Sequence, residues 1–119
     1  MTRFRVDLVL DCDDASTLAP FWANALHYRE HMSWDGVVVL VPNEGEGPPL
    51  VLQRVPEPKL QKNRMHLDIT TDEVEPEVQR LEALGAKRIS DMQSMDSVLW
   101  LTMVDPEGNE FCVCEGVRW

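Results

Sequence analysis

The feature that most constrains the fold is one order of elements that occurs twice along the 119-residue chain. Alternating or continuous apolar residues predict strands, and a one-sided apolar stripe predicts a helix between the first two strands of each half. In the first half we expect a strand at 4–11, a helix ending near 26, and strands at 28–32, 36–41 and 50–55. In the second half we expect a strand at 65–70, a helix at about 72–84, and strands at 87–90, 98–104 and 110–115. The chain is therefore predicted to be one α+β domain of two strand–helix–strand–strand–strand modules, about 1–58 and about 62–119.

Short similarities within this order favour a duplication. Asp13 or Asp14 is expected to cap the first helix. Asp72 and Glu75 form a predicted capping box at the second helix, and Gly85 is expected to end it. Asp14 and Asp72 are 58 residues apart, which agrees with a repeat of half the chain length.

Composition excludes several functions. A net charge of −10, from 11 basic and 21 acidic residues, offers no basic face for a phosphate backbone, so we expect no nucleic-acid partner. No apolar run approaches the roughly 18 residues that span a bilayer, and Asp7 comes too early for a secretory signal, so we expect a cytoplasmic protein without a membrane partner. An odd number of cysteines, Cys12, Cys112 and Cys114, favours free thiols in a reducing compartment over a disulfide framework.

The faces of the predicted strands indicate where a ligand would bind. A sheet with a helix on one face leaves its other face bare, and two such faces could enclose a cleft, within one chain or across a dimer. Alternation puts Asp7, Gln53, His66 and Cys112 on the bare faces. Asp7 and His66 are 59 residues apart, as are Gln53 and Cys112, which suggests equivalent positions in the two modules. These four donors could surround one metal ion or orient one ligand; alternatively, His66 is a hydrogen-bonded structural residue and Cys112 is simply buried.

Three stretches carry a resemblance to a known family. They read LDCDDASTLAPFWANALHY, LVLQRVPEPKLQKNRMHLDI and VDPEGNEFCVCE. With this order and spacing, the sequence resembles the vicinal oxygen chelate superfamily, in particular its glyoxalase-like and bleomycin resistance protein-like domains. The resemblance implies paired βαβββ modules that form a cupped mixed sheet around a cleft, usually in a homodimer. Activities in the superfamily include glyoxalase-type isomerisation, extradiol cleavage, epimerisation and metal-free sequestration of antibiotics such as bleomycin.

The resemblance also implies a metal position. Metal-dependent members carry ligands on the first and last strands of each module, and these positions fall on Asp7, Gln53, His66 and Cys112. His66 has a usual identity, whereas Asp7 stands where His is usual, and Gln53 and Cys112 stand where Glu is usual. The resemblance therefore implies either no metal or one divalent metal ion in a non-standard site, and it argues against lactoylglutathione lyase activity.

Two functions remain open at this point. The first is a lyase or isomerase acting on a small oxygenated molecule. In such an enzyme His66 would be the general acid–base, because histidine titrates near neutral pH. Asp7 or Asp68 would orient His66, and Gln53 would hold a substrate oxygen.

The second function is binding without turnover, as in antibiotic sequestration. Trp34 and Trp100 are the best candidates among four tryptophans for stacking on a flat ligand, because the first is expected in a turn and the second on the bare face of a strand. Cys112 would then line the ligand site. The acidic charge of the protein would favour a cationic ligand.

Overall fold

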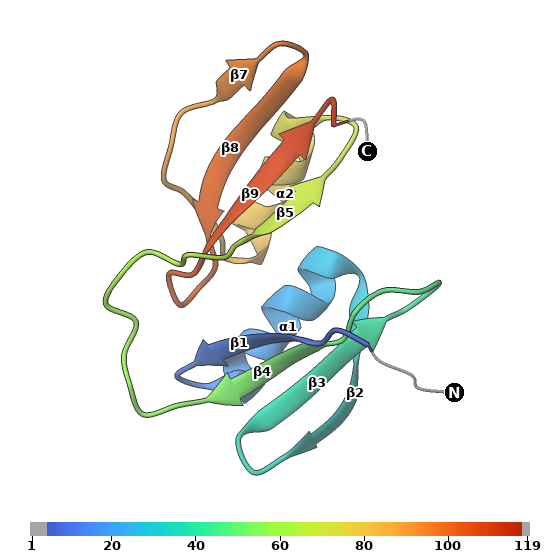
Figure 1. Cartoon of the computed structure of the whole chain (residues 1–119), viewed down its shortest axis with the longest axis vertical. Helices are drawn as coiled ribbons and strands as arrows, with labels where there is room; N and C mark the ends of the chain where they lie inside the picture. Colours follow the sequence, from blue (N-terminus) through green and yellow to red (C-terminus); the bar gives the residue numbers. More distant parts are fainter. Residues whose placement is uncertain (1–4, 118–119) are drawn as a thin grey trace. The chain divides into compact units, whose positions relative to one another are not determined.

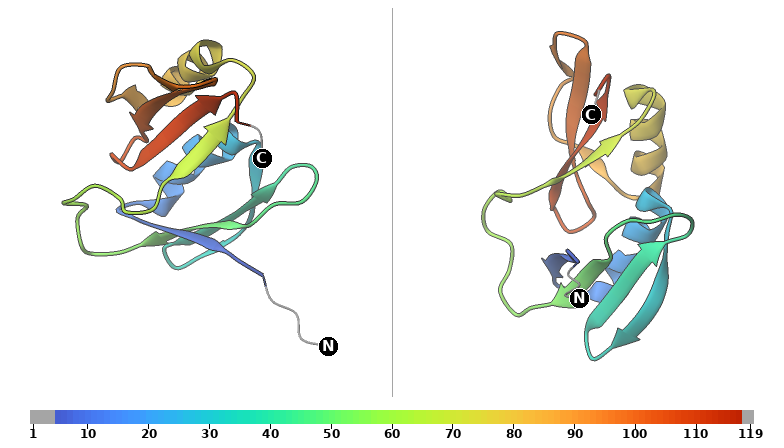
Figure 2. Two further views of the ribbon diagram at one scale, coloured as in Figure 1. Left: turned by 45° about the horizontal axis from the view of Figure 1, so that its top comes forward. Right: turned by 45° about the vertical axis from the view of Figure 1, so that its right-hand side comes forward.

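The computed structural model of the chain describes residues 5–117 and divides into two compact units, one ending at Pro58 and the next beginning at Lys59. In each unit a mixed sheet is covered on one face by one helix (Figure 1). The two further views in Figure 2 show the same arrangement of helix and sheet in each unit. The predicted α+β class is therefore confirmed.

The first unit contains a four-stranded sheet in the order β1-β4-β3-β2. Its elements are β1 (Leu8–Cys12), α1 (Ala15–Leu26), β2 (Tyr28–Trp34), β3 (Val37–Pro42) and β4 (Leu50–Arg54). β1 runs parallel to β4, whereas β4, β3 and β2 are antiparallel neighbours. β1 begins at Leu8 although a strand was expected from residue 4, so Asp7 lies before the strand; residues 1–4 are outside the described part.

Apolar side chains on the inner face of the first sheet pack under α1. Leu18 and Trp22 of α1 and Leu40 and Leu52 of the sheet are each at most 2% exposed. The helix begins after Asp14, whose Oδ1 accepts the Thr17 N–H at 3.2 Å. Bonds from the Ser16 and Thr17 hydroxyls lower the pKa of Asp14, as expected for a carboxylate that receives several donors. The predicted cap is confirmed at Asp14.

The second unit contains a five-stranded sheet with the path β5-β9-β8-β6, and β7 also pairs with β8. Its elements are β5 (Leu67–Thr70), α2 (Val74–Leu84), β6 (Lys87–Arg88), β7 (Gln93–Met95), β8 (Val98–Val104) and β9 (Glu110–Glu115). β7 was not predicted, because Gln93, Ser94 and Met95 are all exposed and lack an alternating apolar pattern. β8 and β9 have the predicted bounds.

The start of α2 differs from the prediction. Its N-cap is Glu73 and not Asp72, and no side chain of the N-cap bonds the first turn. The Val74 N–H is instead donated to Oε1 of Glu115 on β9 at 2.9 Å, and Glu75 bonds Arg88. A carboxylate from the sheet therefore replaces the predicted local capping box. Gly85 ends the helix with φ 116°, as predicted, because this left-handed backbone suits glycine.

The two helices are short. Neither helix in the described part of the chain has both the length and the hydropathy that crossing a bilayer requires.

Candidate ligand and metal site

The outer face of the second sheet brings polar side chains into one row. Strand register pairs Asp68 of β5 with Cys112 of β9, and Cys112 with Thr102 of β8. Phe111 and Val113, on either side of Cys112 in sequence, are fully buried on the inner face. Because strand residues alternate between faces, burial of these two neighbours turns Cys112 outward beside Asp68 and Thr102.

His66 joins this row from just before β5. Its Nε2 lies 3.2 Å from Oδ1 of Asp68, and the two side chains are 40% and 55% exposed. One ligand atom each of His66, Asp68 and Cys112 lies within 4.8 Å of the others. Oγ1 of Thr102 lies 3.5 Å from Sγ of Cys112. An imidazole nitrogen, a carboxylate oxygen and a sulfur thus converge on one half-exposed spot, which we call the His66–Asp68–Cys112 cluster.

This cluster fits a divalent cation with a small closure of its side chains. Ligand atoms that share a tetrahedral ion lie roughly 3.3–3.8 Å apart, given bonds of about 2.0–2.3 Å. All separations here are within 4.8 Å, so the donors need to approach one another by at most about 1–1.5 Å. The exposed side chains of His66 and Asp68 are free to make this movement, since surface rotamers exchange readily.

A second row of side chains lies on the same face, two residues further along β9 from Cys112. Trp100 of β8 is half-buried and faces the same side as Thr102, next to Cys114 of β9 and Gln93 of β7. Burial raises the pKa of the Cys114 thiol to about 11, with further contributions from Asp68 and Cys112. Cys114 therefore remains a protonated, buried thiol at neutral pH, and Trp100 offers a partly exposed aromatic side chain beside the cluster.

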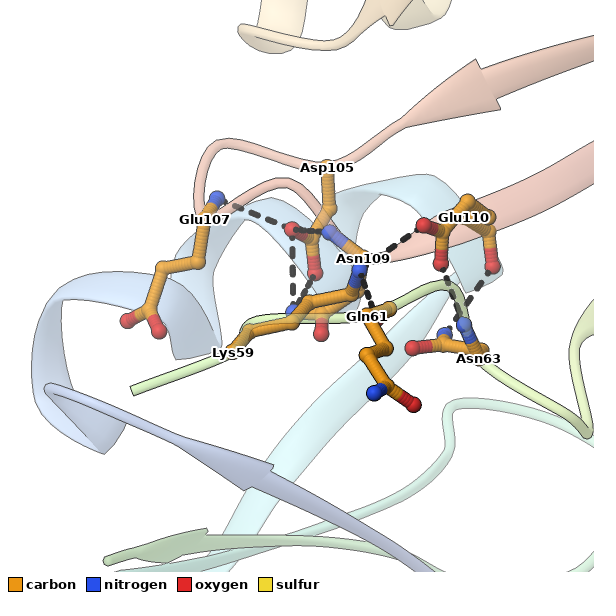
Figure 3. A network of polar contacts seen from close by, with 7 residues as sticks. All are labelled: Lys59, Gln61, Asn63, Asp105, Glu107, Asn109 and Glu110. Carbon is orange, nitrogen blue, oxygen red and sulfur yellow. Dashed lines mark hydrogen bonds and ion pairs between the residues drawn. The ribbon is translucent and has the colours of Figure 1, made fainter. Parts of the chain in front are cut away.

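Glu110 lies on the same face as Cys112 but is occupied by the segment that leads to His66 (Figure 3). Its Oε1 accepts from Lys59 Nζ at 2.8 Å and its Oε2 accepts from the Asn63 N–H at 2.9 Å. Lys59 also donates to the carbonyl oxygen of Gln61 at 2.7 Å. Partial burial alone would raise the pKa of Glu110, but the bonds from Lys59 and Asn63 outweigh it and the pKa is lowered. Glu110 therefore holds residues 59–63 against the sheet, and neither of its oxygens is available to bind a metal ion.

The tight turn before β9 is built around a buried carboxylate, which Figure 3 also shows. Asp105 is 2% exposed, and its Oδ1 accepts from the N–H groups of Glu107 at 2.8 Å and Asn109 at 2.9 Å. Nδ2 of Asn109 donates to Oδ2 of Asp105 at 2.9 Å. The turn fixes where β9 begins and therefore where Cys112 lies along the sheet.

The remaining predicted site residues belong to the first unit. Asp7 is exposed and forms an ion pair with Arg5 at 3.1 Å. Gln53 pairs with Asp11, four residues beyond Asp7, so Asp7 and Gln53 are not neighbours within this unit.

Gln53 does share a row with the predicted aromatic residue. Register aligns Gln53 of β4 with Val37 of β3, and Val37 with Trp34 of β2. Trp34 is the last residue of its strand, is 53% exposed, and lines a hollow of about 270 Å³ together with Arg54. The functional roles of Asp7, Gln53 and Trp34 stay predictions.

One residue of the face was missed in the sequence. Thr102 has the same parity on its strand as Trp100, which was selected, and this parity is the signal that could have identified it. Asp68 was expected only to contact the ligand or to orient His66; its position within the cluster adds a possible metal ligand.

The fold agrees with a comparison against known families. A family model described as a glyoxalase-like domain matches residues 7–114. The chain belongs to this family. No curated protein sequence matches it.

Solved structures of the wider glyoxalase/bleomycin resistance/dioxygenase family share the fold. An enzyme of that family from Burkholderia phytofirmans PsJN is 14% identical, with a TM-score of 0.76, and the match covers 94% of this chain and 100% of that chain. The fosfomycin resistance protein FosX from Listeria monocytogenes is also 14% identical, with a TM-score of 0.78 and coverage of 98% and 96%. A variant of the latter, with a TM-score of 0.75, 14% identity and coverage of 95% and 90%, was solved with Mn(II) and 1S,2S-dihydroxypropylphosphonic acid. At these identities the similarity concerns the fold.

Proposed function

We propose that this glyoxalase-like protein binds a small oxygenated molecule on the outer face of its second sheet and acts on it as a lyase or isomerase, with one divalent cation held by His66, Asp68 and Cys112. The observation that carries the proposal is the convergence of these three donors within 4.8 Å. A cation held there would polarise an oxygen of the bound molecule.

Each residue of the site would have its own role in binding the cation or the ligand. His66, Asp68 and Cys112 would hold the cation through three protein donors, the number found in catalytic sites that also take up a substrate. Thr102 lies close enough to donate its hydroxyl hydrogen to the sulfur of Cys112. Trp100 offers an apolar surface beside the cation for the carbon skeleton of the ligand. The solved FosX complex, which contains Mn(II) and a dihydroxylated phosphonic acid, supports the class of ligand.

The alternative is a metal-free protein that sequesters its ligand. The pair His66–Asp68, at 3.2 Å, favours it, because an imidazole held by a carboxylate also serves as a hydrogen-bond donor to a ligand without any metal. Trp34, 53% exposed, would add a stacking surface in the first unit. Under this alternative the ligand is held by aromatic and polar contacts and leaves unchanged.

The other sequence predictions are part of the same proposal. They are a homodimer, a cytoplasmic location, the absence of a nucleic-acid partner, and roles for Asp7 and Gln53 in binding a ligand. The residue predictions have a direct test, since Asp7→Ala and Gln53→Ala should each weaken ligand binding.

The deciding experiment combines metal analysis with binding. Tag-free protein, with and without chelator treatment, is analysed by mass spectrometry for bound metal, and its tryptophan fluorescence is titrated with a panel of vicinal diols, 2-oxo acids and 2-oxoaldehydes. We expect about one cation per chain, lost together with binding or turnover after chelation. His66→Ala should remove the cation, whereas His31→Ala, on an exposed position of β2, should not.

The outcomes separate the two functions. A metal-free protein that still binds a member of the panel, with affinity lost in His66→Ala, supports sequestration. Binding of neither cation nor any panel member refutes a ligand site at the cluster.

A further inference from the structure

We infer that Cys112 binds the cation as a thiolate and that the site therefore selects a zinc-class divalent ion over manganese or magnesium. The inference rests on the proposed function, because it specifies the cation of the same site. It concerns the metal class and the role of a residue that stands where the family resemblance implies a glutamate.

The donor set favours an ion of intermediate softness. Thiolate sulfur selects zinc and similar ions, imidazole nitrogen suits zinc, copper, iron and nickel, and only oxygen-rich sets suit magnesium, calcium and manganese. The cluster offers one sulfur, one imidazole and one carboxylate. Three protein donors with one open position are the usual pattern of a catalytic zinc site. Mn(II) in the FosX complex is a harder ion than this set would select.

The surroundings limit how many oxygen donors could be added. Glu110 is the nearest further carboxylate along β9 on this face, and both of its oxygens are already engaged, by Lys59 at 2.8 Å and by the Asn63 N–H at 2.9 Å. Its side chain is only 12% exposed. Moving Glu110 to the cation would break these contacts and release residues 59–63. Glu110 therefore adds no oxygen to the cluster from β9, which disfavours ions that require about six oxygen ligands.

Among the three cysteines, only Cys112 is placed to bind. Cys12 and Cys114 are each 5% exposed, whereas Cys112 is more accessible and belongs to the cluster. A bound dication deprotonates a coordinating thiol, so the charge of the thiolate would be neutralised locally. The hydroxyl of Thr102, 3.5 Å from Sγ, would stabilise this sulfur by donating to it.

The test uses cobalt, which reports sulfur ligation directly. Metal-free wild-type protein is titrated with Co(II), and the near-ultraviolet thiolate-to-cobalt charge-transfer band is recorded. We expect this band in the wild type and in Cys114→Ser, and its loss in Cys112→Ser. We also expect Zn(II) to bind more tightly than Mn(II), and Cys112→Ser to lose at least the roughly 10–100-fold in Zn(II) affinity that removing an outer-shell partner costs.

A second measurement uses only the wild type and does not depend on the folding of a variant. Zn(II) should protect Cys112 from alkylation by iodoacetamide, as mapped by peptide mass spectrometry, and Mn(II) should protect it less. Co(II) binding without a charge-transfer band, unchanged Zn(II) affinity in Cys112→Ser, or tighter binding of Mn(II) would each overturn this inference while leaving the proposed function in place. Failure of every cation to bind would overturn the inference together with the metal-dependent form of the proposed function, leaving metal-free sequestration.

Discussion

Glu115 is expected to stabilise α2 from a strand, and Glu115→Ala tests this. The carboxylate accepts the Val74 N–H at 2.9 Å in a partly buried contact, and Val74 itself is fully buried. Leaving that N–H without an acceptor costs about 1–2 kcal/mol, and losing the negative charge at the helix N-terminus costs about 0.3–1 kcal/mol. We therefore expect a loss of about 1.3–3 kcal/mol in the free energy of unfolding, or about 5–12 °C in Tm at about 4 °C per kcal/mol.

Matched variants show whether the interpretation is right. Glu115→Gln keeps an acceptor for the Val74 N–H and should lose only the part of about 0.3–1 kcal/mol due to charge. Glu73→Ala and Asp72→Ala should have little effect, because the N-cap side chain makes no bond to the first turn. Urea and thermal unfolding followed by circular dichroism measure all four proteins against the wild type. A larger loss in Asp72→Ala than in Glu115→Ala would refute the cap from β9 and restore the local capping box.

Two further predictions follow from other contacts. The pKa of Glu110 is lowered from 4.5, so its carboxylate stabilises the fold above that pH and this contribution is lost as the pH falls through the folded-state pKa. The difference in unfolding free energy between the wild type and Glu110→Gln should therefore shrink below about pH 4.5. A constant difference down to about pH 3 would contradict this assignment. Val9 is 57% exposed and lies in register with Val51, Val39 and Met32, which together form an apolar row on the outer face of the first sheet. We expect Val9→Asp to convert the predicted homodimer to a monomer, as measured by light scattering. A wild-type monomer, or an unchanged dimer in Val9→Asp, would exclude this row from an interface.

The order of elements could be predicted because most strands and both helices carry strong local patterns. Alternation in the last strand and a continuous apolar run in the strand before it defined β9 and β8 with their observed bounds. Asp14 and Gly85 were recognised because capping chemistry depends on the residue itself. These features need only a few neighbouring residues to be recognised.

Features that depend on distant partners were missed. β7 is polar and exists as a strand because β8 offers it a pairing edge, with Ser94 opposite Leu99. The cap of α2 comes from Glu115, 41 residues after the amide that it accepts. No pattern within either segment indicates such a partner, so a local capping box was the expected but wrong solution.

The candidate site depends on register more than on sequence spacing. Equal spacing of 59 residues suggested that Asp7 and Gln53 match His66 and Cys112, yet Gln53 lies beside Asp11, while Cys112 lies beside Asp68. A shift of two residues in the pairing of β5 with β9 would keep every side chain on its face and still separate Asp68 from Cys112.

What prevents such a shift is the buried inner face. Leu67 pairs with Phe111 and Ile69 with Val113, and both β9 residues are fully buried under α2, so moving the strands would leave these side chains in the wrong holes of the core. The turn at Asp105, which directly precedes β9, also fixes where that strand begins. The donors Asp68 and Cys112 are therefore brought together by packing on the opposite face of the sheet, and substitutions in that core should alter the distance between them without changing either residue.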